Sequence, residues 1–151
     1  MHRTLALLLA LAIATPALAG VNVPPPKIKG TYDAIVVRVI DGDTVIVTVP
    51  AWASTPFATR SVRIYGIDTP ESHMPPGKCA AEVALGQAAA NYGKTLTKAG
   101  DKVRIGFVGD DKYGGRIDAT LQLPNGHDWG ATMITTKHAA PYDGATKQSW
   151  C

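Results

Sequence analysis

The stretch Ala34–Val49, which reads AIVVRVIDGDTVIVTV, decides the fold of this chain. It contains two runs rich in β-branched residues, 35–40 and 45–49, on either side of a turn at Asp41-Gly42. β-Branched side chains favour extended backbone, and Asp-Gly between two such runs is an ordinary hairpin signal. The stretch therefore predicts two strands joined by a tight turn.

The rest of the chain alternates between strand-like and helix-like segments. Further strands are expected near 61–67, 102–108 and 116–123. The Ala-rich segment 79–98 predicts a helix, and a shorter helix is expected near 128–138. Three strands, a helix, two strands and a helix describe an α+β domain. A five-stranded barrel with both helices packed against it is one natural closure.

The N-terminus has the pattern of a signal peptide over residues 1–19. The charged start Met1–Arg3 is followed by the apolar run Leu5–Ile13 and by Ala17–Ala19, which has the small-x-small form of a cleavage site. A buried N-terminal helix is the alternative, but the order of these features favours export to the periplasm or the medium, with no membrane attachment after cleavage. Residues 20–30 are proline-rich and predict an extended leader.

The composition fits one small domain with a weakly basic balance. A chain of 151 residues can build one core and leaves no room for a second. Its 15 Lys and Arg residues against 12 Asp and Glu residues give a formal net charge of +3. This balance permits a polyanionic partner but does not argue for one, so any phosphate chemistry must rest on a few placed charges.

The chain has two cysteines, Cys79 and Cys151. In an exported protein an even count is compatible with one disulfide bond, which would tie the C-terminus to the middle of the chain. Two separate thiols are the alternative, and the sequence does not decide between them. We favour the disulfide bond.

Four carboxylates lie at the ends of expected strands. Asp41 and Asp43 belong to the first turn, and Asp68 and Glu71 follow the third strand. Taken singly, each reads as a solvated turn residue. If the two strand ends meet in a sheet, however, the acids converge beside Arg63 of the third strand. Hard oxygen ligands in that number suit calcium or magnesium, and the scattered histidines give no zinc-like spacing.

A third polar segment, Asp110–Arg116, reads DDKYGGR. On its own it predicts a polar hairpin between the last two strands. Lys112, Tyr113 and Arg116 nevertheless offer phosphate donors and one aromatic surface on the same loop.

Together the three motifs resemble the staphylococcal nuclease (thermonuclease) family. The matching residues are Asp41–Val45, then Arg63 followed after four residues by Asp68–Glu71, and then Asp111–Gly114. They occur in the family's order and at similar separations, over roughly residues 32–140. The resemblance implies an OB-type Greek-key barrel for residues 31–151. It also implies an endonuclease that depends on Ca²⁺ and hydrolyses the phosphodiester bonds of DNA and RNA.

The resemblance implies a role for each side chain of the first two motifs. Asp43 and Asp68 would be metal ligands through their carboxylates, and Thr69 through its backbone carbonyl. Glu71 would orient and deprotonate the attacking water. Arg63 would hold the scissile phosphate and stabilise the charge that it gains.

For the third motif, the resemblance assigns Lys112 and Tyr113 to the nucleotide site and an arginine to the far side of the phosphate. The family places this arginine directly after Asp-Lys-Tyr-Gly, whereas here Gly115 intervenes before Arg116. One inserted residue reverses side-chain direction in a strand. We therefore expect a glycine bulge that restores the aim of Arg116.

Two other interpretations stay open. The same barrel could bind nucleic acid without cutting it, although a pure binder has no need of Asp43, Asp68 and Glu71 together. Alternatively, the carboxylates could hold a structural calcium ion in an exported interaction domain. For a domain of this size we expect a monomer.

Overall fold

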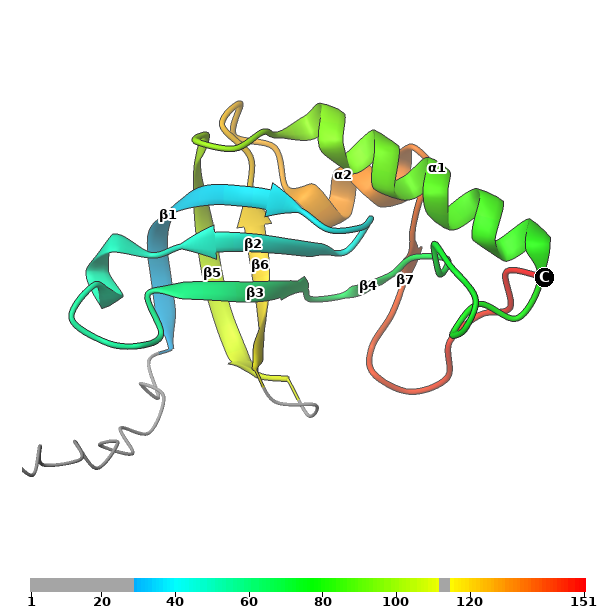
Figure 1. Ribbon diagram of the computed structural model, residues 1–151, viewed down its shortest axis with the longest axis horizontal. Coiled ribbons are helices and arrows are strands. Elements are labelled where there is room, and N and C mark those ends of the chain that lie inside the picture. The colour runs from blue at the N-terminus through cyan, green and yellow to red at the C-terminus, as the bar shows by residue number, and fades with distance from the viewer. Residues whose placement is uncertain (1–28, 112–114) are drawn as a thin grey trace, which may run out of the picture.

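The computed structural model describes residues 29–111 and 115–151. The predicted signal peptide 1–19 and all but the last two residues of the predicted leader 20–30 therefore lie outside the described residues. Five strands form a closed barrel (Figure 1). They are β1 (Gly30–Val39), β2 (Thr44–Thr48), β3 (Thr59–Ile64), β5 (Lys102–Asp110) and β6 (Arg116–Gln122).

The strand order around the barrel is β1-β2-β3-β6-β5, and β5 pairs with β1 to close it. All pairs are antiparallel except β3 with β6, which run parallel. This single parallel pair arises because the helical segment between β3 and β5 carries the chain across the barrel. The α+β class and the five-stranded barrel predicted from the sequence are confirmed.

The barrel core follows from the alternation of side chains along each strand. On β6, Ile117, Ala119 and Leu121 are buried while the residues between them are at least partly exposed. Val47 of β2 and Val62 of β3 face the same interior and are fully buried. Removal of these apolar side chains from water is the main force that closes the sheet.

Two helices cover the same side of the barrel (Figure 1). They are α1 (Ala80–Leu96) and α2 (Trp129–Thr135). Asp128 caps α2, because its Oδ1 accepts a hydrogen bond of 2.8 Å from the Ala131 amide. Trp129 is fully buried, and its indole Nε1 donates a hydrogen bond of 2.9 Å to the Gly42 carbonyl oxygen. The second helix therefore fixes the turn between β1 and β2.

The third predicted strand, 61–67, is wrong in one respect, because it is broken at Gly66. β3 ends at Ile64, and a separate short strand β4 (Ile67–Asp68) pairs with β7 (Ala140–Pro141) outside the barrel. Gly66 has φ of 85°, a left-handed conformation that glycine adopts without strain. The chain turns away from the barrel there, so Asp68 lies beside the C-terminal segment.

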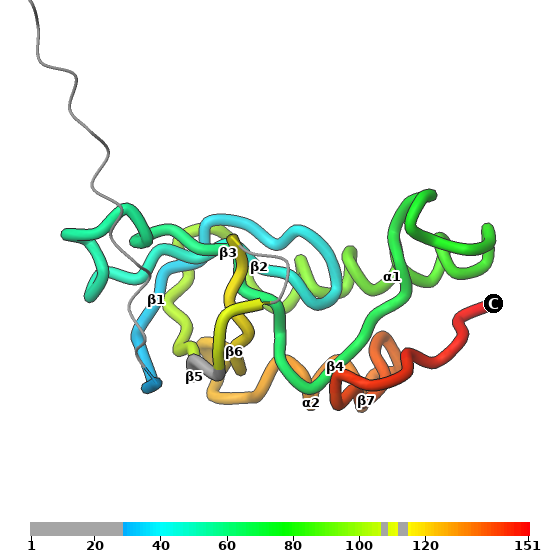
Figure 2. Tube along the Cα trace, turned by 90° about the horizontal axis from the view of Figure 1, so that it is seen from below, coloured from blue at the N-terminus to red at the C-terminus, as the bar shows by residue number. Residues whose placement is uncertain are grey.

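Short stretches of the chain outside the barrel complete the fold. A single turn of 3₁₀-helix, η1 (Pro50–Trp52), follows β2. Cys79 and Cys151 are joined by a disulfide bond with a Cα–Cα distance of 6.1 Å. The C-terminal end therefore lies beside the start of α1, as both views show (Figures 1 and 2). Within the described ranges, neither helix has the length and apolar character that crossing a bilayer requires.

Candidate active site

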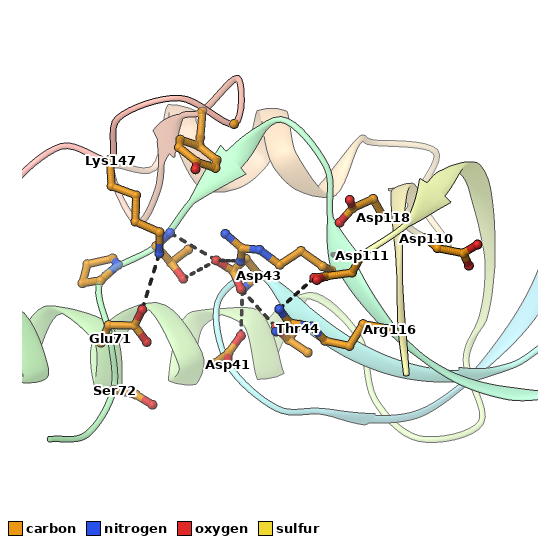
Figure 3. Close-up of a pocket in the computed structure, with 15 residues that line it drawn as sticks. Asp41, Asp43, Thr44, Glu71, Ser72, Asp110, Asp111, Arg116, Asp118 and Lys147 are labelled. Atoms are coloured by element: carbon orange, nitrogen blue, oxygen red, sulfur yellow. Dashed lines mark hydrogen bonds and ion pairs between the residues drawn. The ribbon is translucent and has the colours of Figure 1, made fainter. Parts of the chain in front are cut away.

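A pocket of about 460 Å³ lies where the start of β2, the β5–β6 turn and the C-terminal segment meet (Figure 3). Five of the predicted site residues line it: Asp43, Arg63, Thr69, Glu71 and Arg116. The other lining residues are Asp41, Thr44, Pro70, Ser72, Asp110, Asp111, Asp118, Tyr142, Gly144 and Lys147. The first two sequence motifs and part of the third thus meet in one cavity.

Barrel register brings these side chains together. Arg63 of β3 pairs with Thr44 of β2 on one side and with Asp118 of β6 on the other. The Ile64 amide donates a hydrogen bond of 2.7 Å to the backbone carbonyl oxygen of Asp43. The parallel β3–β6 pair therefore places the second and third motifs side by side, although more than fifty positions separate Arg63 from Arg116 in sequence.

Asp43 is buried and fully engaged by hydrogen-bond donors. Its Oδ1 accepts from Thr44 Oγ1 at 3.0 Å, and its Oδ2 accepts from Thr69 Oγ1 at 2.9 Å and from the Thr69 amide at 3.3 Å. Arg63 Nη1 forms an ion pair with the same Oδ2. Burial acts to raise the pKa of Asp43, but the charge and hydrogen bonds of Arg63, together with the two threonines, lower it overall. Asp43 is therefore a charged carboxylate.

Asp68 lies behind the pocket wall, with only 3% of its side chain exposed. Its Oδ1 contacts Arg63 Nη2 at 3.4 Å and Lys147 Nζ at 2.8 Å. Its Oδ2 accepts a hydrogen bond of 3.3 Å from Trp150 Nε1. Arg63 thus bridges Asp43 and Asp68. Burial acts to lower the pKa of Arg63, but the charges of these carboxylates raise it overall, so the guanidinium stays charged.

Glu71 is the more accessible acid, with 34% of its side chain exposed. Its Oε1 lies 3.5 Å from Lys147 Nζ, and its side chain points into the pocket (Figure 3). The backbone at Pro70 and Glu71 runs directly over Gly86 of α1, where a Cβ atom would overlap the Glu71 carbonyl group. The absence of a side chain at Gly86 therefore allows the Glu71 backbone to lie against α1.

Arg116 faces the same pocket from the first residue of β6. Its Nη2 lies 2.7 Å from Asp111 Oδ2, and the Asp111 amide donates a hydrogen bond of 3.2 Å to the Arg116 carbonyl oxygen. Gly115 precedes the strand with φ of 72°. The β5–β6 ladder has a register shift between Phe107 and Gly109. The glycine bulge expected before Arg116 adjoins residues 112–114, which lie outside the described residues, so it stays a prediction.

Two predicted residues of the third motif are not placed by the structure. Lys112 and Tyr113, assigned to substrate binding by resemblance, lie outside the described residues. Their assignment stays a prediction.

Sequence reasoning gave no role to several charged residues of the pocket. Burial and the charge of Asp43 raise the pKa of Asp41 to about 6. Burial and the charge of Asp111 also raise the pKa of Asp118. Asp118 could have been found, because it lies two residues after Arg116 on one strand and therefore shares its face. Lys147 carried no signal of its own apart from its nearness to Cys151.

The pocket is acidic although the chain as a whole is basic. Its lining includes six carboxylates and three basic side chains. Burial is the larger cause of the raised pKa values of Asp41 and Asp118, and the charges of Asp43 and Asp111 add to it. Such a pocket attracts cations and repels phosphate groups unless a cation is present.

The oxygen donors of this site fit a hard divalent cation, but the protein supplies few side-chain ligands. Carboxylate oxygens of Asp43 and Asp68 and the Thr69 carbonyl are oxygen ligands of the kind that calcium takes. Both carboxylates already contact one guanidinium, which shows that the space between them accepts a positive charge. Within residues 29–111 and 115–151, however, no three His, Cys, Asp or Glu side chains form a group that could hold a metal ion. Water would have to supply the remaining ligands.

The protein is a closed OB-type barrel with a charged pocket at one end of its strands. A sequence comparison identifies one relative. Over 122 residues, or 78% of this chain, the sequence is 32% identical to endonuclease YhcR of Bacillus subtilis (strain 168). The matched region is 10% of that protein, so this chain spans about a tenth of its relative's length. No protein-family model matches the chain. The homology and the five-stranded barrel confirm the resemblance to the staphylococcal nuclease family.

Proposed function

We propose that this protein is an exported nuclease that uses Ca²⁺ to hydrolyse the phosphodiester bonds of DNA and RNA. The observation that carries the proposal is the half-buried Arg63, which bridges Asp43 and Asp68 next to Glu71 in a pocket that Arg116 also faces. The similarity to an endonuclease supports the reaction class. Calcium as the ion and both nucleic acids as substrates rest on the family resemblance.

The two arginines provide the phosphate-binding groups of this proposal. A phosphoryl group in transfer gains charge on its equatorial oxygens, and planar guanidinium groups match phosphate geometry. Arg63 is held by two carboxylates and Arg116 by Asp111, so neither arginine needs to reorganise much when a phosphate arrives. Preorganised donors of this kind are worth about 10²–10³ in rate each.

Glu71 is the proposed general base. Its partial exposure lets water reach it, and its Oε1 lies 3.5 Å from Lys147 Nζ at the edge of the carboxylate cluster. A bound calcium ion would supply Lewis-acid polarisation of a phosphate oxygen. Asp43, Asp68 and the Thr69 carbonyl are the residues that would hold it.

We further propose that the protein acts in the periplasm or the medium, as a monomer. Residues 1–19 have the pattern of a signal peptide, and the pairing of Cys79 with Cys151 suits an oxidising compartment. Lys112 and Tyr113 are proposed to contact the nucleotide.

The decisive experiment compares purified wild-type protein with Glu71→Gln on plasmid DNA, single-stranded DNA and RNA. Each reaction is run in calcium, in magnesium and in chelator. We expect cleavage in calcium, its loss in chelator, and a fall of about 10²-fold or more in Glu71→Gln. Asp143→Asn is the matched control, because it removes one negative charge from an exposed residue of the same C-terminal segment.

Two results would change the proposal. Undiminished cleavage by folded Glu71→Gln protein would refute the role of Glu71 as the base. Nucleic-acid affinity that persists in chelator, with no turnover in any metal, would identify a binding module instead.

A further inference from the structure

The C-terminal segment places a positive charge inside the acidic pocket. Lys147 Nζ lies 2.8 Å from Asp68 Oδ1 and 3.5 Å from Glu71 Oε1. Figure 3 shows this side chain reaching from the C-terminal segment towards Glu71 and the cluster around Asp43. Lys147 thus joins a proposed metal ligand to the proposed base, and neither family resemblance nor sequence pattern assigned it a role.

Available lone pairs show what this charge does to Asp68. A carboxylate offers about four lone-pair sites to donors. Asp68 accepts from Arg63, Lys147 and Trp150, which leaves about one site for another partner. Asp43 accepts from four donors. An ion that also binds Asp43 must therefore displace one of the four donors there, whereas at Asp68 it would meet the like charge of Lys147, whose Nζ lies 2.8 Å from Oδ1.

Of the two cations that contact Asp68, Lys147 is the one that can leave more easily. Its side chain is 49% exposed, whereas that of Arg63 is 16% exposed and is held by both carboxylates. A long, half-exposed lysine can turn its ammonium group into water, and Asp68 keeps Arg63 and Trp150 as partners when it does. Arg63, by contrast, would leave two buried carboxylates without their shared partner.

A covalent tether keeps Lys147 close to the pocket. Cys151 is bonded to Cys79, the residue that caps the N-terminus of α1. Trp150 also donates its indole N–H to Asp68. A displaced lysine therefore remains at high effective concentration next to its carboxylates and returns when the ion leaves.

We propose that Lys147 is a built-in counter-cation of this site: it holds Asp68 and Glu71 in place, and a calcium ion that binds there must compete with its positive charge. The inference rests on the proposed calcium site and extends it. Lys147 is a positioning residue in this account, and the disulfide bond is what makes its competition with the ion effective.

The test measures calcium binding directly, by isothermal titration calorimetry of the purified protein without nucleic acid. Lys147→Gln removes the competing charge, and we expect it to bind calcium about fivefold more tightly than the wild type. Lys147→Arg keeps the charge and should restore an affinity close to the wild-type value. Lys94→Gln, on an exposed position of α1, is the control for net charge.

The role of the Cys79–Cys151 disulfide bond is tested separately. Cys151→Ser releases the C-terminal segment and should tighten calcium binding in the same direction as Lys147→Gln. The two changes act through one contact, so the double variant should show no further gain. Circular dichroism of each variant verifies that it is folded. If Lys147→Gln fails to fold, the calcium affinity of Lys147→Arg is the test. A Lys147→Arg protein that binds calcium more tightly than the wild type would overturn the proposal.

Each remaining outcome overturns a defined part of the account. Equal calcium affinities in wild type and Lys147→Gln would overturn the competition but leave the proposed nuclease standing, provided that its cleavage still requires calcium and Glu71. Weaker binding in Lys147→Gln would do the same, because it would make Lys147 a support for the ion. If neither protein bound calcium, the metal assignment of the proposed function would fall together with this inference.

Discussion

Glycine 86 offers a sharp test of how the fold positions the proposed base. A Cβ atom at this position would overlap the Glu71 carbonyl group and would lie 2.6 Å from the Pro70 carbonyl oxygen. An ordinary contact begins at 3.4 Å, so the Pro70 contact alone requires a shift of about 0.8 Å in Gly86→Ala, and the closer Glu71 carbonyl group requires more. The helix is seventeen residues long and packed, whereas residues 70–71 belong to a connecting loop. The loop that carries Glu71 is therefore the part that moves.

Stability and activity should respond very differently to this substitution. Overpacking costs about 1–3 kcal/mol, while replacing glycine by alanine inside a helix returns about 1 kcal/mol. The net loss of unfolding free energy is thus about 0–2 kcal/mol. A catalytic group displaced by about 1 Å can lose about 10²-fold in rate, so we expect cleavage to fall by about 10- to 100-fold.

The assay is initial-rate cleavage of plasmid DNA in calcium, with chemical denaturation in parallel. Ala88→Ser adds an atom on the exposed face of the same helix and serves as the control, with wild-type activity expected. Full activity of Gly86→Ala at unchanged stability would refute the reasoning, because it would show that the Pro70–Glu71 backbone can yield without moving the carboxylate. A large loss of stability without a loss of specific activity would equally contradict it.

Three further predictions follow from other contacts. Trp129→Phe leaves the buried Gly42 carbonyl without its donor and should lower the free energy of unfolding by about 2 kcal/mol, as measured by denaturant titration. Arg63→Lys cannot span two carboxylates with one planar group, so its cleavage rate should fall by about 10²-fold while circular dichroism stays unchanged. The amide of Lys98 and then a threonine hydroxyl lower the pKa of Asp101, so its contribution to stability is present above its unfolded pKa and is lost as pH falls through the folded value. Asp101→Asn should therefore flatten the acid side of the stability–pH curve, and an unchanged slope would contradict this.

Local pattern was sufficient for most of the barrel. The β-branched runs around Asp41-Gly42 predicted β1 and β2, and the Ala-rich segment predicted α1 to within two residues at either end. The third strand was drawn too long, because strand-like composition continues through Ile67 while the break depends on the positive φ of Gly66. The pairing of β4 with β7 joins residues more than seventy positions apart, and no local pattern announces it.

The residues of the candidate site also divide into those that the sequence could place and those that it could not. Asp43 and Asp68 could be placed beside Arg63 on the condition that the two strand ends meet in a sheet, and Glu71 follows within the same motif. Lys147 could not, because its position depends on which partner Cys151 takes, and the sequence left that choice open. A structure was needed to show that the tail returns to the acids at all.

The charge of the whole chain also misleads about the charge that a substrate meets. A formal net charge of +3 suggests mild attraction to nucleic acid, yet six carboxylates against three basic side chains line the pocket. A phosphate can approach only where positive charge is concentrated, at Arg63, Arg116 and Lys147, or where a bound cation offsets the acids. Lys147 alone among these three cations lies on a segment outside the barrel. If it leaves Asp68 when an ion arrives, the same ammonium becomes free to face the incoming phosphate. One side chain would then pair with the carboxylates before the ion binds and with the phosphate of the substrate afterwards.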